Sequence, residues 1–399
     1  MAALKPRLLV VGPLPPPVGG VETMTQAVLE SHAFDAFELA HADITKHRPK
    51  ETQGRFDAAN FAWAARHISR TATRAARFRP DVAYVPVAGN FSAVLRDLAL
   101  AGVVRRAGAR VIGHQHAGDI ARTLARRGPE RAWMRAMFGA FDRMLLLGEP
   151  WRPLLAAFCR CPTFVVPSTF RREVLAAAAA PRPERARELR ALVVGQFGAG
   201  KGTGELLESL ARLRERGLVV PLTIVGPPQR PGDEAAVLAR RAALNLEQQV
   251  EMAGLKMGEA LWREYRRATL FVLPSHAEGV PVVLHEAGAF GLAVVTTPVG
   301  AIPDLVRDGA NGLLVPSGDV AALADAIERL VGDPALRQRL ADALTHDIAL
   351  FHPDRICARL AGHVRAVLAG SPLEFLPGDP ATAVPPLAPL PARAIAERA

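Results

Sequence analysis

The sequence contains little cysteine for its length. Only Cys159, Cys161 and Cys357 occur in 399 residues, and an odd, sparse set of this kind is typical of a reducing cytoplasm rather than of a disulfide scaffold. Cys159 and Cys161 are close enough to begin a metal site, but the sequence has no second pair to complete it. We therefore interpret both as ordinary thiols.

Long apolar runs are also missing. No stretch approaches the ~18 consecutive apolar residues of a membrane-spanning helix. Lys5 and Arg7 precede the segment LLVVG, which is too short for the apolar part of a signal peptide. The sequence therefore predicts a cytoplasmic protein. Because 399 residues exceed what one hydrophobic core usually serves, it also predicts two domains.

Acidic residues are scarce in the first part of the chain. Residues 1–170 carry 23 lysines and arginines against 13 aspartates and glutamates, so the whole net charge of +10 lies there. Two groups of arginines contribute to it, the first at helical spacing (Arg66, Arg70, Arg74, Arg77) and the second further along (Arg122, Arg126, Arg127, Arg131, Arg135). One-sided basicity of this kind indicates a polyanionic partner.

The surroundings of these arginines narrow the choice of partner. No aromatic platform or recognition motif accompanies them, so we do not expect nucleic acid. Anionic lipid headgroups or a lipid diphosphate fit better, at up to ~1 kcal/mol for each basic residue near such a surface. We expect peripheral association with the inner face of the membrane. The alternative is a solvated, arginine-rich face without a partner.

Short apolar runs alternate with helical stretches throughout the chain. The runs of the first half are RLLVVG, VAYVPV, ARVIGHQH, RMLLLG and TFVVPS, and those of the second are ALVVG, LTIVG, VEMAG, TLFVLP, AVVTT and NGLLV. Such alternation predicts parallel sheets with both faces covered. The fold class is therefore α/β, with two Rossmann-like, doubly wound domains that bind ligands at the carboxyl ends of their strands.

The domain boundary falls between Ser168 and Arg190, where an alanine run gives way to PRPERARE. We predict an N-terminal domain over residues 1–170 and a C-terminal domain over residues 186–368. Residues 369–399 are rich in proline and alanine and lack periodicity, so we expect a disordered tail.

Two glutamates, Glu278 and Glu286, bracket the stretch GVPVVLH. The apolar run before them predicts a buried strand, and Pro281 suits the first position of a following helix. The N–H groups of Val282, Val283 and Leu284 would then point out of the helix start, where phosphate binds readily. Glu286, about one turn into the helix, would hold ribose hydroxyls. This arrangement suits a nucleotide diphosphate that carries a group to be transferred.

The segment EGVPVVLHE resembles the E-x7-E signature of retaining glycosyltransferases of family 4, and the flanking PS, GxP, EAxAxG and PVG elements are similar as well. The resemblance implies a GT-B fold, in which two Rossmann-like domains face a central cleft. It implies a nucleotide-diphosphate sugar as donor, a glycan or lipid-linked acceptor, and a role in envelope or exopolysaccharide synthesis. It also places Glu278 at the reacting sugar.

A glycine-rich loop opens the predicted second domain. Gly195–Lys201 spells the first part of a P-loop, but Gly202 stands where Mg²⁺ binding needs Ser or Thr. The family resemblance offers another interpretation, in which Lys201 is catalytic because it neutralises the donor diphosphate. The family usually has arginine directly after the strand's glycine, whereas this chain has Gln196, which would donate a neutral hydrogen bond.

The first domain offers two further candidate sites. Gly19 and Gly20 end a proline-rich loop, and paired glycines let a backbone approach a phosphate or sugar closely. His114 and His116 lie on one side of a strand, so a metal site and a structural histidine are both open alternatives. The family resemblance favours His116 as a catalytic residue that contacts the donor sugar.

Three expectations complete the hypothesis. Leu255 and Lys256 follow a strand where relatives contact the nucleobase. The sequence has no two aspartates spaced as D-x-D, so we expect no metal and no cofactor beyond the nucleotide-sugar co-substrate. The alternatives are a sugar-nucleotide 2-epimerase of the same fold and an inactive partner that binds nucleotide sugar or polysaccharide.

Overall fold

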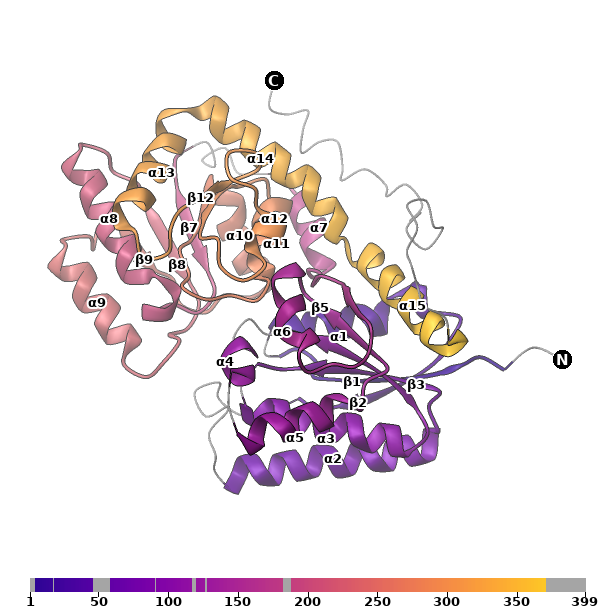
Figure 1. The fold of residues 1–399 in the computed structure, drawn as a ribbon. Helices are drawn as coiled ribbons and strands as arrows, with labels where there is room; N and C mark the ends of the chain where they lie inside the picture. Colours follow the sequence, from indigo (N-terminus) through magenta and orange to yellow (C-terminus); the bar gives the residue numbers. More distant parts are fainter. Residues whose placement is uncertain are drawn as a thin grey trace. The chain divides into compact units, whose positions relative to one another are not determined.

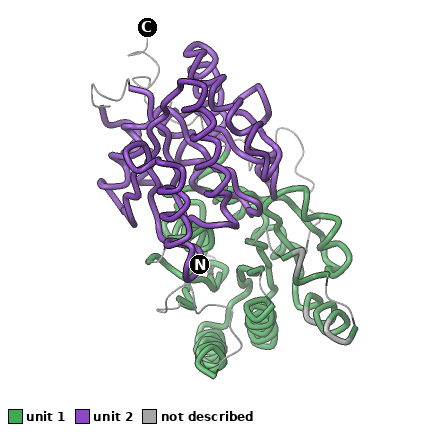
Figure 2. The backbone as a smooth tube through the Cα atoms, turned by 90° about the vertical axis from the view of Figure 1, so that its left-hand side faces the viewer, with its two compact units in different colours: residues 1–171, 351–386 green, residues 172–350, 387–399 purple. Residues whose placement is uncertain are grey.

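The computed structural model describes residues 4–16, 18–45, 58–89, 91–116, 120–125, 128–181 and 188–370. These residues form two compact units, shown in green and purple in Figure 2. The first takes in the described residues up to Arg171 and those from Phe351 onward, and the second runs from Arg172 to Leu350. The tail predicted to be disordered lies outside the described residues from position 371 onward.

The first unit is built on a six-stranded parallel sheet in the order β2-β1-β3-β4-β5-β6. Its strands are β1 (Arg7–Gly12), β2 (Glu38–Asp43), β3 (Val82–Val87), β4 (Arg110–Gln115), β5 (Arg143–Leu146) and β6 (Thr163–Val165). β3 and β5 are buried over their whole length, as the apolar runs predicted for strands covered on both faces. The strand order reverses between β1 and β3, the usual place for a ligand in such a sheet.

The edge strand β2 was not predicted from the sequence. Its residues, ELAHAD, do not form an apolar run: the two end positions are exposed, and buried and partly buried positions alternate between them. Among the described residues β2 pairs only with β1, so it needs less apolar surface than a central strand.

Helices cover both faces of this sheet. They are α1 (Gly20–Glu30), α2 (Ala58–Phe78), α3 (Phe91–Arg106), α4 (Ile120–Leu124), α5 (Pro129–Phe138), α6 (Arg152–Ala156) and α15 (Pro353–Ala369). Figure 1 shows α2, α3 and α5 on one side of the sheet and α1 and α15 on the other.

The long helix α15 corrects one predicted boundary. The sequence placed residues up to 368 in the second domain, but α15 belongs to the first unit. Its residues Ile356, Leu360 and Val364 are buried in one cluster with Leu8 and Val10 of β1. Sequence order alone could not reveal this, because the chain returns to its first sheet after completing the second.

The second unit has its own six-stranded parallel sheet, in the order β12-β11-β10-β7-β8-β9. Its strands are β7 (Ala191–Val194), β8 (Leu222–Val225), β9 (Val250–Met252), β10 (Leu270–Leu273), β11 (Ala293–Thr296) and β12 (Leu313–Leu314). Counted along the chain from β7 and read from the β9 edge, this order is third, second, first, fourth, fifth and sixth, which is the doubly wound Rossmann order. The reversal lies between β7 and β10.

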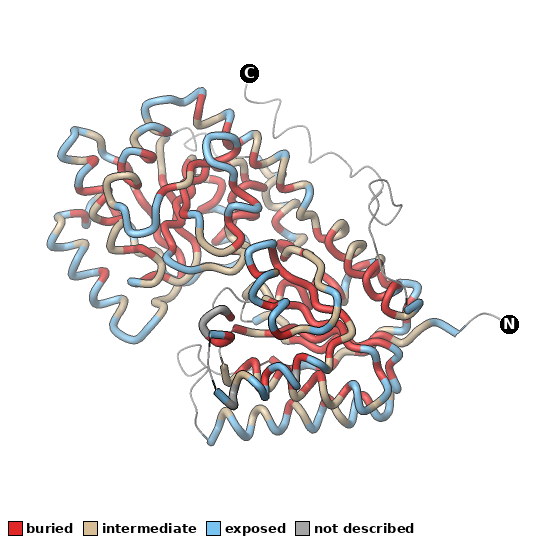
Figure 3. Tube along the Cα trace, in the orientation of Figure 1, coloured by how far each residue is buried: buried red, intermediate tan, exposed pale blue. Residues whose placement is uncertain are grey.

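Helices precede, connect and follow the strands of the second unit as well. They are α7 (Glu173–Ala179), α8 (Thr203–Glu215), α9 (Asp233–Ala243), α10 (Gly258–Arg267), α11 (Val282–Ala289), α12 (Ile302–Leu305), α13 (Val320–Gly332) and α14 (Pro334–Ile348). Burial is concentrated on the strands and on the helix faces that cover them (Figure 3). The predicted pair of Rossmann-like domains is confirmed, whereas the cleft expected between them stays a prediction.

Candidate functional site

Two loops that carry predicted site residues meet at the switch point of the second sheet. Residues 196–201 follow β7 and residues 275–278 follow β10, and these strands are neighbours where the strand order reverses. Gly202 permits the close approach of the loops. Its φ is +67°, and a Cβ there would lie 2.0 Å from the carbonyl oxygen of Pro274. Ligands of doubly wound sheets bind at this position.

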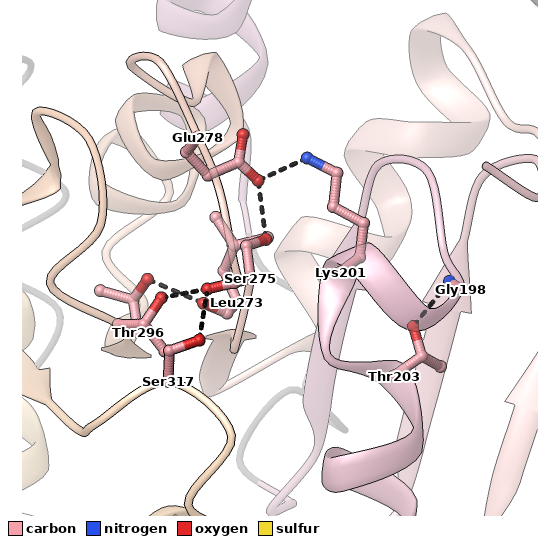
Figure 4. Close-up of polar contacts among 9 residues, drawn as sticks. Gly198, Lys201, Thr203, Leu273, Ser275, Glu278, Thr296 and Ser317 are labelled. Carbon is pink, nitrogen blue, oxygen red and sulfur yellow. Dashed lines mark hydrogen bonds and ion pairs between the residues drawn. The ribbon is translucent and has the colours of Figure 1, made fainter. Parts of the chain in front are cut away.

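Lys201 and Glu278 form an ion pair at this point (Figure 4). Lys201 Nζ donates to Glu278 Oε1 at 2.6 Å, and Ser275 Oγ donates to the same oxygen at 2.7 Å. The side chains of Lys201 and Glu278 are 19% and 12% exposed, respectively. The second carboxylate oxygen, Oε2, has no hydrogen-bond partner within the part of the chain that the structure describes. It is therefore available to accept from a hydroxyl group.

The loop that carries Glu278 is held from the neighbouring strand. Thr297 Oγ1 donates to the carbonyl oxygen of Ser275 at 2.6 Å. Gly300 has a φ of +62°, and a Cβ on it would lie 2.2 Å from the carbonyl oxygen of Glu278. The PVG element is thus a packing requirement, since only glycine fits against this backbone.

The start of α11 presents two backbone donors. Pro281 is the N-cap residue and α11 begins at Val282, one position later than predicted. The N–H of Leu284 is used within the turn, because it donates to the carbonyl oxygen of Pro281 at 3.0 Å. The N–H groups of Val282 and Val283 have no acceptor among the described residues. Two of the three predicted N–H groups are therefore available at the positive end of the helix.

Glu286, the predicted ribose contact, is buried within the second unit. It is 2% exposed, and its Oε2 accepts from Tyr265 Oη at 2.9 Å. Tyr265 is itself clamped between aromatic rings, with its centroid 4.9 Å from that of Phe290 and 6.0 Å from that of Phe271. The tyrosine therefore fixes the position of the carboxylate.

The remaining candidates of the second unit are Gln196, Leu255 and Lys256. Gln196 is half-buried, and its side chain has no hydrogen-bond partner among the described residues. Leu255 is 70% exposed in the loop after β9. Lys256 forms an ion pair with Glu264, with its Nζ 2.6 Å from Glu264 Oε1. The P-loop alternative is disfavoured, because the hydroxyl of Thr203 accepts from the N–H of Gly198 at 3.0 Å and closes the turn (Figure 4).

The glycine pair of the first unit lies at the start of α1. Gly19 is the N-cap residue with extended backbone (φ −155°), and Gly20 is the first helical residue. A Cβ on Gly19 would lie 2.4 Å from the carboxylate oxygen Oε2 of Glu22. The flexible side chain of Glu22 can move to relieve this contact, so neither space nor the backbone angle requires glycine at this position.

His116 lies at the carboxyl end of β4, beside two other polar rings. The hydroxyl of Tyr84 is 2.8 Å from His114 Nδ1 and 3.0 Å from His116 Nε2. His114 Nε2 is 2.8 Å from the carbonyl oxygen of Val166. Both nitrogens of His114 are thus engaged, which argues against the alternative of a metal held by the two histidines.

The two arginine groups of the first unit differ. Arg70, Arg74 and Arg77 are exposed on α2, a helix whose sequence contains no acidic residue. In the second group, Arg131 and Arg135 donate to the carbonyl oxygens of Leu124 and Ala157. Arg126 and Arg127 lie outside the described residues, and of Arg122 only the place in α4 is described. Arg70, Arg74 and Arg77 therefore form an exposed basic face on α2.

Sequence reasoning missed three residues that support the candidate site residues. Ser275 lies two positions after the end of β10, so its place near the carboxyl end of a strand was a usable signal. Tyr84 and Tyr265 gave a weaker one: they are the only tyrosines of the chain, and a buried tyrosine hydroxyl usually needs a partner.

Comparison with known proteins identifies the family of the second unit. Residues 178–346 match the family described as glycosyl transferases group 1. The resemblance seen in the segment around Glu278 and Glu286 is thereby confirmed, and this region is a domain of that family.

Individual relatives align over part of their length. The alpha-D-kanosaminyltransferase of Streptomyces kanamyceticus is 34% identical over 152 residues, which are 38% of this chain and 38% of that protein. The amylovoran biosynthesis glycosyltransferase AmsK of Erwinia amylovora is 37% identical over 149 residues, 36% of each chain. The chain thus spans less than two fifths of the length of these relatives.

A solved structure extends the likeness over most of the chain. HepE from Anabaena, in complex with UDP and glucose, has a TM-score of 0.69 and 16% identity, and covers 90% of this chain and 99% of its own. Similarity at this level of identity shows the fold alone. The chain has the two-domain GT-B fold. None of the helices among the described residues combines the length and the apolar character needed to cross a membrane.

Proposed function

We propose that this protein is a retaining glycosyltransferase that moves a sugar from a nucleotide-diphosphate sugar to a glycan or lipid-linked acceptor. The observation that carries the proposal is the Lys201–Glu278 pair at the switch point of the second sheet. It combines one ammonium group, one carboxylate with an open oxygen and, on α11, two backbone donors without acceptors among the described residues.

The proposed chemistry follows from the charges that develop during transfer. Breaking a glycosyl–phosphate bond leaves negative charge on the diphosphate and positive charge on the sugar. Lys201 and the N–H groups of Val282 and Val283 stabilise the diphosphate, each by a few kcal/mol (about 2–4) in a preorganised site. Glu278 Oε2 orients a sugar hydroxyl or supports the positive sugar. Glu286 binds the ribose, and Leu255 and Lys256 flank the nucleobase.

Retention and metal independence are part of this proposal. The leaving group is neutralised by protein donors, so we propose that no divalent cation and no further cofactor take part. The nucleotide diphosphate leaves the anomeric carbon and the acceptor hydroxyl attacks it on the same face of the sugar, which retains the anomeric configuration. His116, Gly19, Gly20 and Gln196 complete the donor site in the proposed mechanism.

The acceptor and the location are proposed from the charge of the first unit. The exposed arginines of α2 favour an anionic surface, so we propose a cytoplasmic protein that associates peripherally with the inner face of the membrane. The relative AmsK is named for amylovoran biosynthesis. This name supports a role in envelope or exopolysaccharide synthesis.

The test is a nucleotide-release assay with a panel of UDP-, GDP- and ADP-sugars, with and without membrane extracts as acceptor. Mass spectrometry identifies the product, and NMR determines its anomeric configuration. We expect release with at least one donor, a retained configuration and full activity in EDTA. The matched control is Glu278→Gln, which keeps the shape of the side chain and removes its charge.

The outcomes separate the alternatives. An epimerised nucleotide sugar formed without acceptor would identify a 2-epimerase. Binding of a donor without any release would identify an inactive nucleotide-sugar-binding partner. Loss of activity in EDTA, restored by Mg²⁺, would contradict metal independence and leave the transferase assignment standing.

A further inference from the structure

A buried tyrosine joins two histidines in the first unit. Tyr84 of β3 is 1% exposed, and β3 pairs in parallel with β4, which carries His114 and precedes His116. The centroids of the two imidazole rings lie 4.2 Å apart. The tyrosine hydroxyl, with one proton to donate, lies within hydrogen-bond distance of both rings.

The hydrogen bonds of His114 determine which of its ring nitrogens carries the proton. The carbonyl oxygen of Val166 is only an acceptor, so His114 Nε2 must carry a hydrogen. Burial lowers the pKa of His114 to about 4, so the ring is neutral at pH 7 and has no second proton. His114 Nδ1 is therefore an acceptor, and the hydroxyl of Tyr84 donates to it.

The hydrogen bond between Tyr84 and His116 determines which ring nitrogen of His116 carries the proton. Because Tyr84 gives its only proton to His114, its oxygen accepts from His116 Nε2, which must carry a hydrogen. Burial, followed by the neighbouring His114, holds the pKa of His116 well below its usual range, so this ring is neutral too. His116 Nδ1 is left as a bare lone pair.

That lone pair accepts no hydrogen bond within the described part of the fold. His116 Nδ1 is buried and has no hydrogen-bond partner among the described residues. An unpaired buried acceptor costs free energy and is unusual in a native structure, so it calls for an explanation. A group that satisfies it must donate a hydrogen bond, which a hydroxyl does and a phosphate oxygen does not.

We propose that Tyr84 is a positioning residue that holds His116 in the Nε2–H tautomer, so that its Nδ1 accepts a hydrogen bond from a hydroxyl of the bound sugar. The choice of a sugar rests on the proposed function, whereas the tautomer does not. Because Nδ1 is covered, binding must also shift the atoms around it. Tyr84 thereby selects substrates with a donor group at this position.

The tautomer is tested first by ¹⁵N NMR of protein labelled at histidine. In the wild type at pH 7 we expect His116 to be protonated at Nε2 alone, and in Tyr84→Phe to populate both tautomers. Tyr265→Phe is the matched control, since it removes the other tyrosine hydroxyl and should leave His116 unchanged. Protonation of His116 at Nδ1 in the wild type, or an unchanged tautomer in Tyr84→Phe, would contradict the proposal that Tyr84 fixes the tautomer.

The role of Nδ1 is tested by adding a nucleotide sugar to the same labelled protein. We expect the Nδ1 resonance of His116 to move as its lone pair accepts a hydrogen bond. In turnover, Tyr84→Phe should lower kcat/KM about tenfold, the usual scale of one hydrogen bond. His116→Asn, whose Oδ1 takes the place of Nδ1, should retain more activity than His116→Gln.

The tautomer of His116 and its contact with the sugar can be contradicted independently. A wild type that transfers no sugar contradicts the proposed function and the sugar-binding role, while the NMR spectra still decide the tautomer. An unchanged Nδ1 resonance on donor binding, together with equal activity of His116→Asn and His116→Gln, would overturn the sugar contact even in an active enzyme. Should Tyr84→Phe fail to fold, the wild-type spectrum and the two His116 variants decide both points.

Discussion

Lys201 and Glu278 lie 77 positions apart in the sequence, yet their charged groups are 2.6 Å apart in the second unit. The doubly wound topology makes them neighbours, because it places the loops after β7 and β10 side by side. In the proposed mechanism, the ammonium group of Lys201 turns from the carboxylate to the diphosphate of the donor. Glu278 thus holds the lysine in place until the donor binds.

The first prediction concerns the charge of Lys201. Lys201→Ala should lower turnover about 10²–10³-fold, the usual cost of removing one preorganised donor from a developing negative charge. Lys201→Arg keeps the charge and should retain more of the activity. Nucleotide release measured with the donor in excess gives the comparison, and donor affinity is measured separately by calorimetry. Unchanged turnover and affinity in Lys201→Ala would remove this residue from the mechanism.

The second prediction concerns the buried carboxylate of Glu286. Glu286→Gln should weaken donor binding about 10–100-fold, since hydrogen bonds to a charged group contribute about 1.5–3 kcal/mol. Tyr265→Phe should act in the same direction, because the hydroxyl that fixes the carboxylate is lost. Calorimetric titration with the nucleotide sugar measures both variants. Glu328→Gln on α13 serves as a surface control, and equal affinities in all three variants would contradict the ribose role.

Sequence patterns predicted the central strands well and the edge strand poorly. Runs such as VAYVPV and LFVL are buried throughout, so hydrophobicity alone reveals them. β2 was not predicted, because an edge strand is partly exposed and lacks a continuous apolar run. The assignment of α15 failed for a different reason: its apolar face fits a parallel sheet of either unit, and only the folded chain decides between them.

The candidate site was predictable where it depends on loops after strands. Lys201 and Glu278 lie in the loops that follow β7 and β10, so their meeting follows from topology. The supporting residues were not predictable, because Tyr265 reaches Glu286 from another helix, 21 positions away. The use of the Leu284 N–H within the turn is equally a matter of local geometry that residue types do not encode.

The third prediction concerns the basic face of α2. Changing Arg70, Arg74 and Arg77 to Gln should weaken binding to vesicles that contain anionic lipid, by up to ~1 kcal/mol for each residue. The control changes Arg212, Arg263 and Arg339, three exposed arginines of the second unit, and so removes the same charge elsewhere. Vesicle co-sedimentation at low and physiological salt measures the difference. Equal binding of the two triple variants would contradict a membrane role for α2.

The fourth prediction concerns acid stability. Burial lowers the pKa of His114 and His285 to about 4 and, together with the nearby Arg143 and Arg359, that of His363 to about 3. In the unfolded chain each histidine titrates near 6.5, so below about pH 6.5 the unfolded state binds more protons. The stability from the neutral rings is therefore complete above about pH 6.5 and falls by about 1.4 kcal/mol per pH unit for each histidine as the pH drops towards 4.

Urea unfolding between pH 7 and pH 4.5 measures this dependence. His363→Gln should reduce the slope of the first unit's unfolding free energy by one proton, because it removes one group that titrates only in the unfolded state. An unchanged slope would contradict the buried, neutral state of His363.

The last prediction concerns the glycine that lets the two site loops meet. Gly202→Ala adds a Cβ that would lie 2.0 Å from the carbonyl oxygen of Pro274, at a φ of +67°. Gly217 is the matched control: its φ is +82°, but a Cβ there would meet nothing within 4 Å. Both substitutions should cost about 1–2 kcal/mol for the left-handed backbone, and Gly202→Ala should cost a further 1–3 kcal/mol or so for the clash.

Because the obstacle is backbone, relief requires moving the end of β10, and with it the loop that carries Glu278. Gly202→Ala should therefore lose donor binding while it is still folded, whereas Gly217→Ala should keep it. Equal unfolding free energies for the two variants would show that the loops do not need this close approach.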